Sequence, residues 1–229
     1  MHPFKGFLCT SMSKSVQEDT LKHQGMRRKM IEELGRKDRF DPLVLEAMMK
    51  VPRHVFLDPI FVQQAYSDTA FQIGAQQTIS HPSTVAYQTT QLNIKRGDKI
   101  LEIGTGSGYQ TCVLLELGAK VFTIERQREL YDVTSAFLPM MGYKPKFYYG
   151  DGYKGLPTFA PFDKILVTCG APFVPEDLLQ QLKVGGVLVI PVGEGKVQLM
   201  KRITRTGEQT FETEELKQFS FVPMLSSKA

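Results

Sequence analysis

The chain has 229 residues, of which 42% are hydrophobic and 23% are charged, and these are the proportions of a globular protein that can bury a substantial core. Its formal net charge of +4 is too small and too dispersed for a dedicated nucleic-acid-binding protein, and no apolar run is long enough to span a membrane. Three irregularly spaced cysteines and four scattered histidines, with no ligand pair among them, indicate neither a disulfide framework nor a metal site.

Residues 1–14 lack the charged start, apolar middle and cleavage site of a secretory signal, and we interpret them as a flexible tail. Together with cysteines that look like reduced thiols, this favours a cytoplasmic protein. A rough apolar stripe from Leu21 to Leu34 predicts a helix that ends at Gly35, and Asp41-Pro42 supplies the N-cap and first-turn proline of a second helix. The first part of the chain is therefore expected to form a helical cap.

Residues 67–82 (SDTAFQIGAQQTISHP) have little periodicity and predict a long loop, which Ile73 and Ile79 would dock against the core. Long loops inside compact domains are usually functional or disordered. Pro82 then begins a helix that continues to Leu92.

The most informative stretch is KILEIGTGSGY, residues 99–109. Its apolar, β-branched first half predicts a buried strand, and Gly104, Gly106 and Gly108 let the backbone turn tightly and approach a ligand. Helical spacing resumes at Tyr109 and stops at Gly118. In an open parallel sheet, ligands bind at this junction between a strand end and a helix N-terminus.

The glycine spacing departs from the dinucleotide fingerprint, because position 109, where its last glycine belongs, holds a tyrosine. Glu125, at the end of the next strand and about twenty residues past the first glycine, is placed to accept hydrogen bonds from the hydroxyls of a ribose. The alternative is a plain βαβ unit in which Glu125 only caps the following helix. Loop and acid together favour adenosine binding.

Further strands are predicted at 146–149, 163–167 and 187–190, with helices at 126–141 and 175–182 and an antiparallel pair at 197–203 and 210–221. This alternation predicts an α/β fold with a doubly wound, mostly parallel sheet, an antiparallel C-terminal edge and an N-terminal helical cap. We expect one domain over residues 15–225, with cap and substrate loop at 15–95, the core at 96–225 and a C-terminal tail at 226–229.

Three further strand ends carry small or polar residues on the predicted ligand edge: Asp151-Gly152, Thr168 to Pro172 and Pro191 to Glu194. Asp151-Gly152 could place a carboxylate near an adenine amino group, although an Asx-turn in Gly-Asp-Gly would use the same residues equally well. Thr168 follows another strand. The chain contains neither a nucleophile elbow nor a phosphate loop, which favours a reaction without a covalent enzyme intermediate, such as methyl transfer from a sulfonium donor.

The motif Glu102-x-Gly-x-Gly-x-Gly resembles the first motif of S-adenosylmethionine-dependent methyltransferases. The specific resemblance is to the protein-L-isoaspartate O-methyltransferase family, over about residues 25–225, and it is carried by Ile73-Gly74, Thr78-Ile79-Ser80, Leu101 to Gln110, Gly150 to Gly152, Val167-Thr168, Gly185-Gly186 and Pro191 to Glu194. It implies a Rossmann-like core that binds S-adenosyl-L-methionine and releases S-adenosyl-L-homocysteine.

The resemblance also implies roles for individual residues. Ser80 matches the active-site serine of the family. Donor-binding positions would be Gln76, Gln77, Thr78, Glu102, Gly104, Thr105, Gly106, Ser107, Gly108, Glu125, Arg126, Asp151, Gly152 and, less securely, Gln198. Substrate-binding positions would be Ile73, Gly74, Ile79, Ser80, Thr168 and Val222.

The implied substrates are damaged proteins and peptides that carry L-isoaspartyl or D-aspartyl residues, whose free α-carboxylate would be methylated so that a succinimide can form and be hydrolysed. A carboxylate is already a nucleophile at pH 7, so Ser80 would orient it by hydrogen bonding. From the residues alone, Ser80 reads as a helix-start serine before Pro82. His81 and Cys169-Gly170 depart from the family pattern beside the expected acceptor site and bear on peptide preference.

Two other functions stay open at this point. One is a methyltransferase acting on RNA or a small molecule, although Thr168 to Phe173 offers no charged or amide side chain for a base edge. The other is an adenosine-binding sensor that performs no chemistry. As partners we expect isoaspartyl substrates, no nucleic acid and no membrane, and the protein itself as a monomer or weak homo-oligomer.

Overall fold

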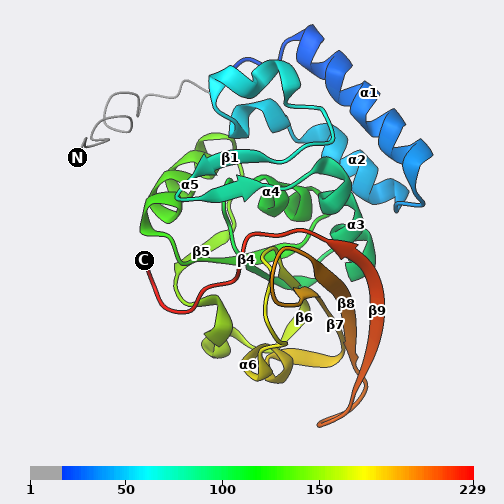
Figure 1. Cartoon of the computed structure of the whole chain (residues 1–229), viewed down its shortest axis with the longest axis vertical. Helices are drawn as coiled ribbons and strands as arrows, with labels where there is room; N and C mark the ends of the chain where they lie inside the picture. The colour runs from blue at the N-terminus through cyan, green and yellow to red at the C-terminus, as the bar shows by residue number, and fades with distance from the viewer. Residues whose placement is uncertain (1–16) are drawn as a thin grey trace.

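The computed structural model describes residues 17–229, so the predicted tail at 1–14 lies outside the described part. Its centre is a seven-stranded sheet in the order β5-β4-β3-β6-β7-β8-β9 (Figure 1). The first five strands of that order are parallel, while β8 is antiparallel to β7 and to β9. The predicted mostly parallel sheet with an antiparallel C-terminal edge is confirmed. The strands are β3 (Lys99–Ile103), β4 (Lys120–Glu125), β5 (Lys146–Tyr149), β6 (Phe162–Val167), β7 (Leu182–Val192), β8 (Gln198–Arg205) and β9 (Phe211–Phe219).

Helices cover both faces of the sheet, because its strands alternate apolar residues between two buried cores. On one face lie α3 (Pro82–Leu92), α4 (Tyr109–Glu116) and α5 (Arg128–Met140), against Ile100 and Val121 among others. The opposite core contains Leu101, Ile103 and Leu178 and is covered by α6 (Glu176–Gln180) and two 3-10 turns, η3 (Gly152–Lys154) and η4 (Pro157–Phe159). The order in which strands are added to the sheet reverses between β3 and β6, which is where an open α/β sheet offers a ligand crevice.

The N-terminal cap consists of α1 (Leu21–Lys37), α2 (Pro42–Lys50) and the 3-10 turns η1 (Arg53–Phe56) and η2 (Pro59–Gln64). The Asp41 carboxylate accepts a 2.8 Å hydrogen bond from Leu43 N, which confirms the predicted N-cap of α2. The prediction that Gly35 ends α1 is wrong: Gly35 stays helical, and the helix ends where Asp38 N donates to Leu34 O. An added Cβ at Gly35 would touch Leu45, so this glycine lies at the contact between α1 and α2.

The segment predicted as a long loop contains an antiparallel hairpin, β1 (Phe71–Gly74) and β2 (Gln77–Ile79). Phe71 pairs with Ile79 and Gln72 with Thr78. The connection passes through Ala75 and Gln76, which both have positive φ, at 47° and 58°. Non-glycine residues rarely adopt this left-handed conformation, and tight hairpins usually have Asn-Gly at these two positions. The sequence has Ala75-Gln76 there, so it contains no hairpin signal.

β7 begins five residues earlier than predicted, at Leu182, and the expected turn at Gly185-Gly186 lies inside the strand. Gly185 has a φ of 81°, and an added Cβ at Gly186 would lie 2.8 Å from Lys183 O and 2.9 Å from Asp163 O. The two glycines therefore form an irregularity within the strand, where its register against β6 shifts, and they do not end it.

After β9 the chain runs back across the sheet toward α5 and β5 (red in Figure 1). Gly170 N donates to Val222 O and Met224 N donates to Gly170 O, at 2.8 and 2.7 Å. The tail at 226–229 is also attached: Ala229 N donates to Arg126 O, and Arg128 N donates to Ala229 O. The end of the chain is thus fixed against the loop after β4.

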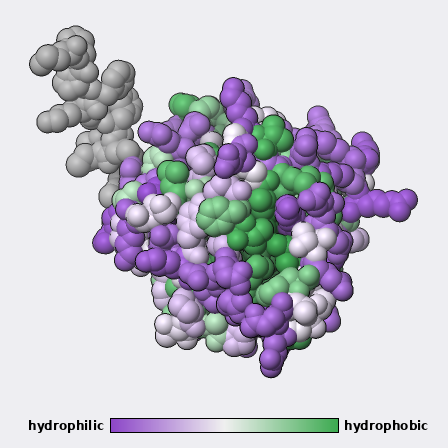
Figure 2. Space-filling view, turned by 60° about the horizontal axis from the view of Figure 1, so that its bottom comes forward, coloured by the Kyte–Doolittle hydropathy of each residue, from purple (hydrophilic) through white to green (hydrophobic). Residues whose placement is uncertain are grey.

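Figure 2 shows a strip of apolar residues on one face of the molecule, surrounded by hydrophilic ones. Large apolar side chains with more than half of their surface exposed include Leu21, Ile60, Met140 and Phe173. Within residues 17–229, no helix is long and apolar enough to span a membrane.

Candidate functional site

A pocket opens at the carboxyl ends of the parallel strands and encloses about 590 Å³, including its open mouth. Four strand ends, the β2 strand and the C-terminal segment contribute to its wall. The lining residues are Gln77, Thr78, Ile103, Gly104, Gly106, Ile124, Glu125, Arg126, Gly152, Thr168, Cys169, Val222, Pro223, Met224 and Leu225.

The glycine loop after β3 is held from several sides by threonine hydroxyls. Thr168 Oγ1 donates to the carbonyls of Ile103 and Gly104, and Thr134 Oγ1 donates to Gly106 O at 2.7 Å. A Cβ at Gly104 would lie 2.6 Å from Thr168 Oγ1, and Gly104 has a φ of 95°. Only glycine fits this close approach, so the path of the loop depends on a glycine at position 104.

Glu125 lies at the end of β4, lines the pocket and is only 4% exposed. Its carboxylate accepts a hydrogen bond from Gly106 N at 2.9 Å and another from Gln127 N at 2.8 Å. Each carboxylate oxygen has a second lone pair, so the group can still accept from a bound hydroxyl. Glu125 therefore organises both the glycine loop and the start of α5 while it faces the pocket.

Both oxygens of the Asp151 side chain are engaged within the protein. Oδ1 accepts from Tyr153 N at 3.0 Å, which is the Asx-turn interpretation of Gly-Asp-Gly, and Oδ2 accepts from Ser227 N at 2.9 Å. Asp151 itself does not line the pocket, whereas its neighbour Gly152 does. An added Cβ at Gly152 would lie 2.4 Å from Ile103 Cγ2, so a side chain there would displace the pocket wall.

Glu102 is fully buried in β3, one residue before the loop. Thr111 Oγ1 donates to its Oε2 at 2.6 Å, while Oε1 has no hydrogen-bond partner. Burial, opposed by the hydrogen bonds of Thr111 and Thr123, raises the pKa of Glu102 to about 7. A buried, charged carboxylate with an oxygen that lacks a donor is costly, so burial favours the protonated, neutral form of Glu102.

Ser80 directly follows β2, whose residues Gln77 and Thr78 line the pocket. The helix-start interpretation of this serine is wrong. The N-cap position of α3 is His81, which makes no side-chain cap bond, and Asp68 Oδ1 accepts from Ser83 N at 2.9 Å. The Ser80 side chain is partly buried, and its hydroxyl does not cap α3.

Other predicted site residues surround the pocket without lining it. Ile73 packs on the glycine loop, since a Cβ at Gly106 would lie 3.4 Å from Ile73 Cδ1. Ile79 is buried, and Gly74 and Gln76 flank the hairpin turn. Thr105, Ser107 and Gly108 continue the loop behind the lining residues: the Thr105 hydroxyl lies 2.6 Å from that of Thr123, and Ser107 Oγ accepts from Tyr109 N.

The amide of Gln198 lies away from the pocket. Its Nε2 donates to Gly195 O at 2.7 Å, and its Oε1 accepts from Phe221 N at 2.9 Å. The residue is 2% exposed and connects the β7–β8 loop to the C-terminal segment. Its contacts therefore support the pocket wall at Val222 to Leu225.

Sequence reasoning missed Pro223, Met224 and Leu225, which lie beyond the last strand and carry no motif. Ile103 and Ile124 could have been found, because they are the apolar residues nearest the ends of two parallel strands. Cys169 also lines the pocket, and desolvation raises its pKa to about 12, so its thiol stays protonated at neutral pH.

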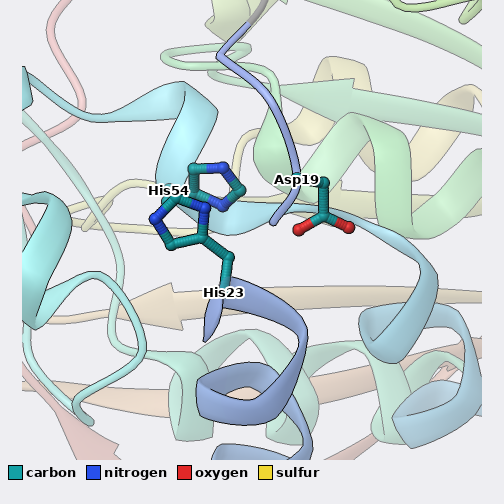
Figure 3. Close-up of side chains that lie close together, drawn as sticks. All are labelled: Asp19, His23 and His54. Atoms are coloured by element: carbon teal, nitrogen blue, oxygen red, sulfur yellow. The ribbon is translucent and has the colours of Figure 1, made fainter. Parts of the chain in front are cut away.

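The histidines were expected to form no ligand pair, but two of them lie together in the structure. His23 and His54 stack with ring centroids 3.9 Å apart, and Asp19 lies beside them, with the three potential ligand atoms within 4.8 Å of one another (Figure 3). The Asp19 carboxylate, however, accepts from Nη1 and Nη2 of Arg27 at 3.0 and 2.8 Å. This guanidinium already balances the carboxylate charge, so Asp19 is held in an ion pair at the start of α1, and the stacked rings of His23 and His54 connect α1 to η1.

Comparison with known proteins identifies the family. The family model described as protein-L-isoaspartate(D-aspartate) O-methyltransferase matches residues 25–229. The chain belongs to this family. A protein-L-isoaspartate O-methyltransferase of Flavobacterium johnsoniae is 55% identical over 212 residues, which cover 92% of this chain and 99% of that protein. The Cytophaga hutchinsonii relative of the same name is 53% identical over 208 residues, or 91% and 94% of the two chains.

Solved structures agree in fold with this family member. A protein-L-isoaspartate O-methyltransferase structure matches with a TM-score of 0.77 and 26% identity, over 86% of this chain and 65% of its own. A putative family member from Plasmodium falciparum, solved with S-adenosyl-L-homocysteine, matches with a TM-score of 0.75 and 24% identity, over 89% and 98%. The family resemblance carried by the glycine and Thr-Ile-Ser motifs is confirmed.

Proposed function

We propose that this protein transfers the methyl group of S-adenosyl-L-methionine to the free α-carboxylate of L-isoaspartyl and D-aspartyl residues in damaged proteins and peptides. The single observation that carries the proposal is structural. A pocket that contains the glycine loop and the buried carboxylate of Glu125 is also lined by Gln77 and Thr78 of β2, the strand that directly precedes Ser80. Donor and acceptor elements therefore meet at one edge of the sheet.

The pocket fits a sulfonium nucleoside, which supplies a methyl group already activated for transfer. Glu125 would accept from the ribose, and the backbone around Gly152 would contact the adenine end. The remaining predicted donor positions would hold the loop and the hairpin in place. These are roles for the residues of this chain, and no metal is needed for any of them.

The acceptor chemistry requires positioning more than base catalysis. One carboxylate oxygen forms the new O–CH₃ bond while the S–CH₃ bond breaks and its electron pair stays on sulfur, so no proton is transferred. Ser80 would donate a hydrogen bond to the other carboxylate oxygen, with Thr168 and Val222 beside it. The methyl ester is a better leaving group than the carboxylate, so the following amide nitrogen closes a succinimide without the enzyme.

We further propose that residues 15–225 act as a single domain, with the cap and substrate hairpin at 15–95, the core at 96–225 and the tail at 226–229. Cytoplasmic location is supported by the thiols of Cys112 and Cys169, which are both unpaired in the described chain. The partners would be isoaspartyl proteins and peptides and no nucleic acid, with the enzyme as a monomer or weak homo-oligomer.

The proposal is tested with methyl-labelled donor and two peptides that differ only in Asp versus isoAsp. We expect base-labile label in the isoAsp peptide alone. Donor binding without transfer to either peptide would instead indicate an adenosine-binding sensor, and equal labelling of both peptides would contradict the proposed substrate.

A further inference from the structure

Arg53 is a buried cation with no acidic hydrogen-bond partner in the described chain. It lies in η1 with no solvent exposure. Its Nε donates to Ala65 O at 3.0 Å, and its Nη2 donates to Thr69 O at 3.2 Å and to Ser80 O at 2.7 Å. These acceptors are neutral carbonyls, and Nη1 has no hydrogen-bond partner among residues 17–229.

The other buried arginine in the cap has the opposite environment. Arg27 is 6% exposed and makes a two-bond ion pair with Asp19. Buried charges in proteins are normally paired in this way, because desolvation of an isolated ion is expensive. The nearest acidic influence on Arg53 is Asp68, but that carboxylate is engaged with Lys37 and with Ser83 N. The charge of Arg53 thus lacks a dedicated counter-ion.

Burial lowers the pKa of Arg53 to about 10, so the guanidinium is still charged at neutral pH. The guanidinium carbon lies 4.9 Å from the centroid of the Tyr109 ring, which offsets part of the desolvation. Tyr109 is the first residue of α4, directly after the glycine loop. Arg53 therefore contacts both elements that must meet for the reaction: the acceptor segment at Ser80 and the helix that follows the donor loop.

We propose that Arg53 is a positioning and specificity-determining residue for the acceptor: it fixes the backbone at Ser80 and leaves there a positive field that selects an anionic α-carboxylate. The inference rests on the proposed function, since it concerns the acceptor of that reaction. Its physical basis is that a charge in a low-dielectric interior acts over several ångströms without contact. An acceptor carboxylate beside Ser80 would supply the negative charge that Arg53 lacks among its hydrogen-bond partners in the described chain.

The test compares two peptides that differ at one group: an isoaspartyl peptide with its free α-carboxylate and the same peptide with that group as a carboxamide. Binding of each is measured by calorimetry to enzyme saturated with S-adenosyl-L-homocysteine. We expect wild type to bind the carboxylate at least about tenfold more tightly than the carboxamide. Arg53→Met should reduce this ratio to below about threefold, because the side-chain length stays and the charge is lost.

Arg53→Lys separates charge from positioning. Lysine keeps the positive charge but cannot donate to three carbonyls in a planar fork, so the binding ratio should stay within about threefold of wild type while kcat falls at least about tenfold. Arg27→Met is the matched control. It removes a buried arginine that has its own carboxylate, and it should lower thermal stability without changing the binding ratio.

The outcomes separate the inference from the function. A wild type that does not methylate the carboxylate peptide overturns the proposed function and this inference with it. A wild type that methylates but binds both peptides equally, or an Arg53→Met variant that keeps the full ratio, overturns the inference alone. If Arg53→Met does not fold, a loss of the ratio in Arg53→Lys overturns it as well, since the charge is still present.

Discussion

At the scale of single residues, the structure shows that Ser80 does not cap α3, although its place before Pro82 suggests that role. Asp68 caps α3 in its place, and the backbone of Ser80 is held from behind by Arg53. A hydroxyl that is positioned but not used as a cap is suited to orient a bound carboxylate.

We therefore expect Ser80→Ala to lower kcat for an isoaspartyl peptide by about 100-fold, since a misplaced acceptor loses alignment with the methyl group. The Kd for S-adenosyl-L-homocysteine should stay within a few fold, because Ser80 does not line the pocket. Steady-state kinetics and calorimetry measure the two quantities. Ser83→Ala, one turn further along, is the control and should leave kcat nearly unchanged; wild-type turnover in Ser80→Ala would remove Ser80 from the active site.

Glu102 predicts a pH-dependent stability of the ligand-free protein. Its pKa rises from an ordinary value of 4.5 to about 7 on folding, so its protonated form is favoured in the native state. The protein should lose up to about 3 kcal/mol from this group as pH rises through 4.5 to 7, with no further loss above. Glu102→Gln removes the titration, so its stability relative to wild type should increase between pH 4.5 and pH 8.

Urea denaturation at several pH values measures this difference. Glu33→Gln changes an exposed side chain of α1, so it is the control and should show no such trend. Parallel stability curves for Glu102→Gln and wild type across this range would mean that Glu102 does not titrate as described.

The sequence predicted those site residues whose role follows from position on a strand. Gly104, Gly106 and Glu125 stand at the ends of β3 and β4, and chain direction alone brings them together. Arg53 could not be found in this way. Its burial depends on contacts with residues 12 to 27 positions away, and no local pattern distinguishes it from a surface arginine.

At the scale of elements, the C-terminal segment is the part of the site that the sequence did not predict. It carries no periodicity, and its position is set by the pairing of Val222 and Met224 with Gly170 and by the Gln198 amide. The β1–β2 hairpin was missed for a related reason, since its turn at Ala75-Gln76 contains no glycine or asparagine. Periodic elements such as β3 and α3 were predicted closely.

Deletion of residues 226–229 should weaken S-adenosyl-L-homocysteine binding by about 3- to 10-fold, because Asp151 and Arg126 lose their partners at the edge of the pocket. The peptide KM at saturating donor should stay within about twofold, since the Ser80 side is untouched. Calorimetry and kinetics measure both. Lys228→Ala, which keeps the backbone bonds, is the control, and unchanged binding after the deletion would contradict a role for the tail.

The start of α1 is held by the ion pair between Arg27 and Asp19, and Arg27 also donates to Met49 O and to the Tyr66 hydroxyl. Asp19→Asn leaves the buried Arg27 without its counter-charge and should cost about 1–3 kcal/mol at pH 7. The hydrogen bond from Arg27 lowers the pKa of Asp19, so the stabilisation is present above its unfolded pKa and is lost as pH falls through the lower folded value.

Denaturation at pH 7 and at pH 2–3 tests this. The difference between Asp19→Asn and wild type should shrink toward the acid end. Glu33→Gln, which breaks the exposed pair with Lys29, should have almost no effect at either pH. If the difference in unfolding free energy between Asp19→Asn and wild type stays constant with pH, the effect of the substitution does not depend on the charge of Asp19.

At the scale of the whole molecule, the sheet edge brings together segments from every part of the described chain. The hairpin comes from the cap, the loops after β3, β4, β5 and β6 come from the core, and Val222 to Leu225 come from the end. The parallel arrangement of the first five sheet strands followed from the alternation of strands and helices. The closure of the pocket could not be predicted in this way, because it depends on where two aperiodic segments dock, the β1–β2 hairpin and the C-terminal segment.

The most direct measurement of this account is a crystal structure with S-adenosyl-L-homocysteine and an isoaspartyl peptide bound together. The nucleoside is expected between Gly106, Glu125 and Gly152, with the sulfur directed at an α-carboxylate that accepts a hydrogen bond from Ser80. A nucleoside bound elsewhere, or a carboxylate that lies away from Ser80 with the pocket filled, would contradict the account.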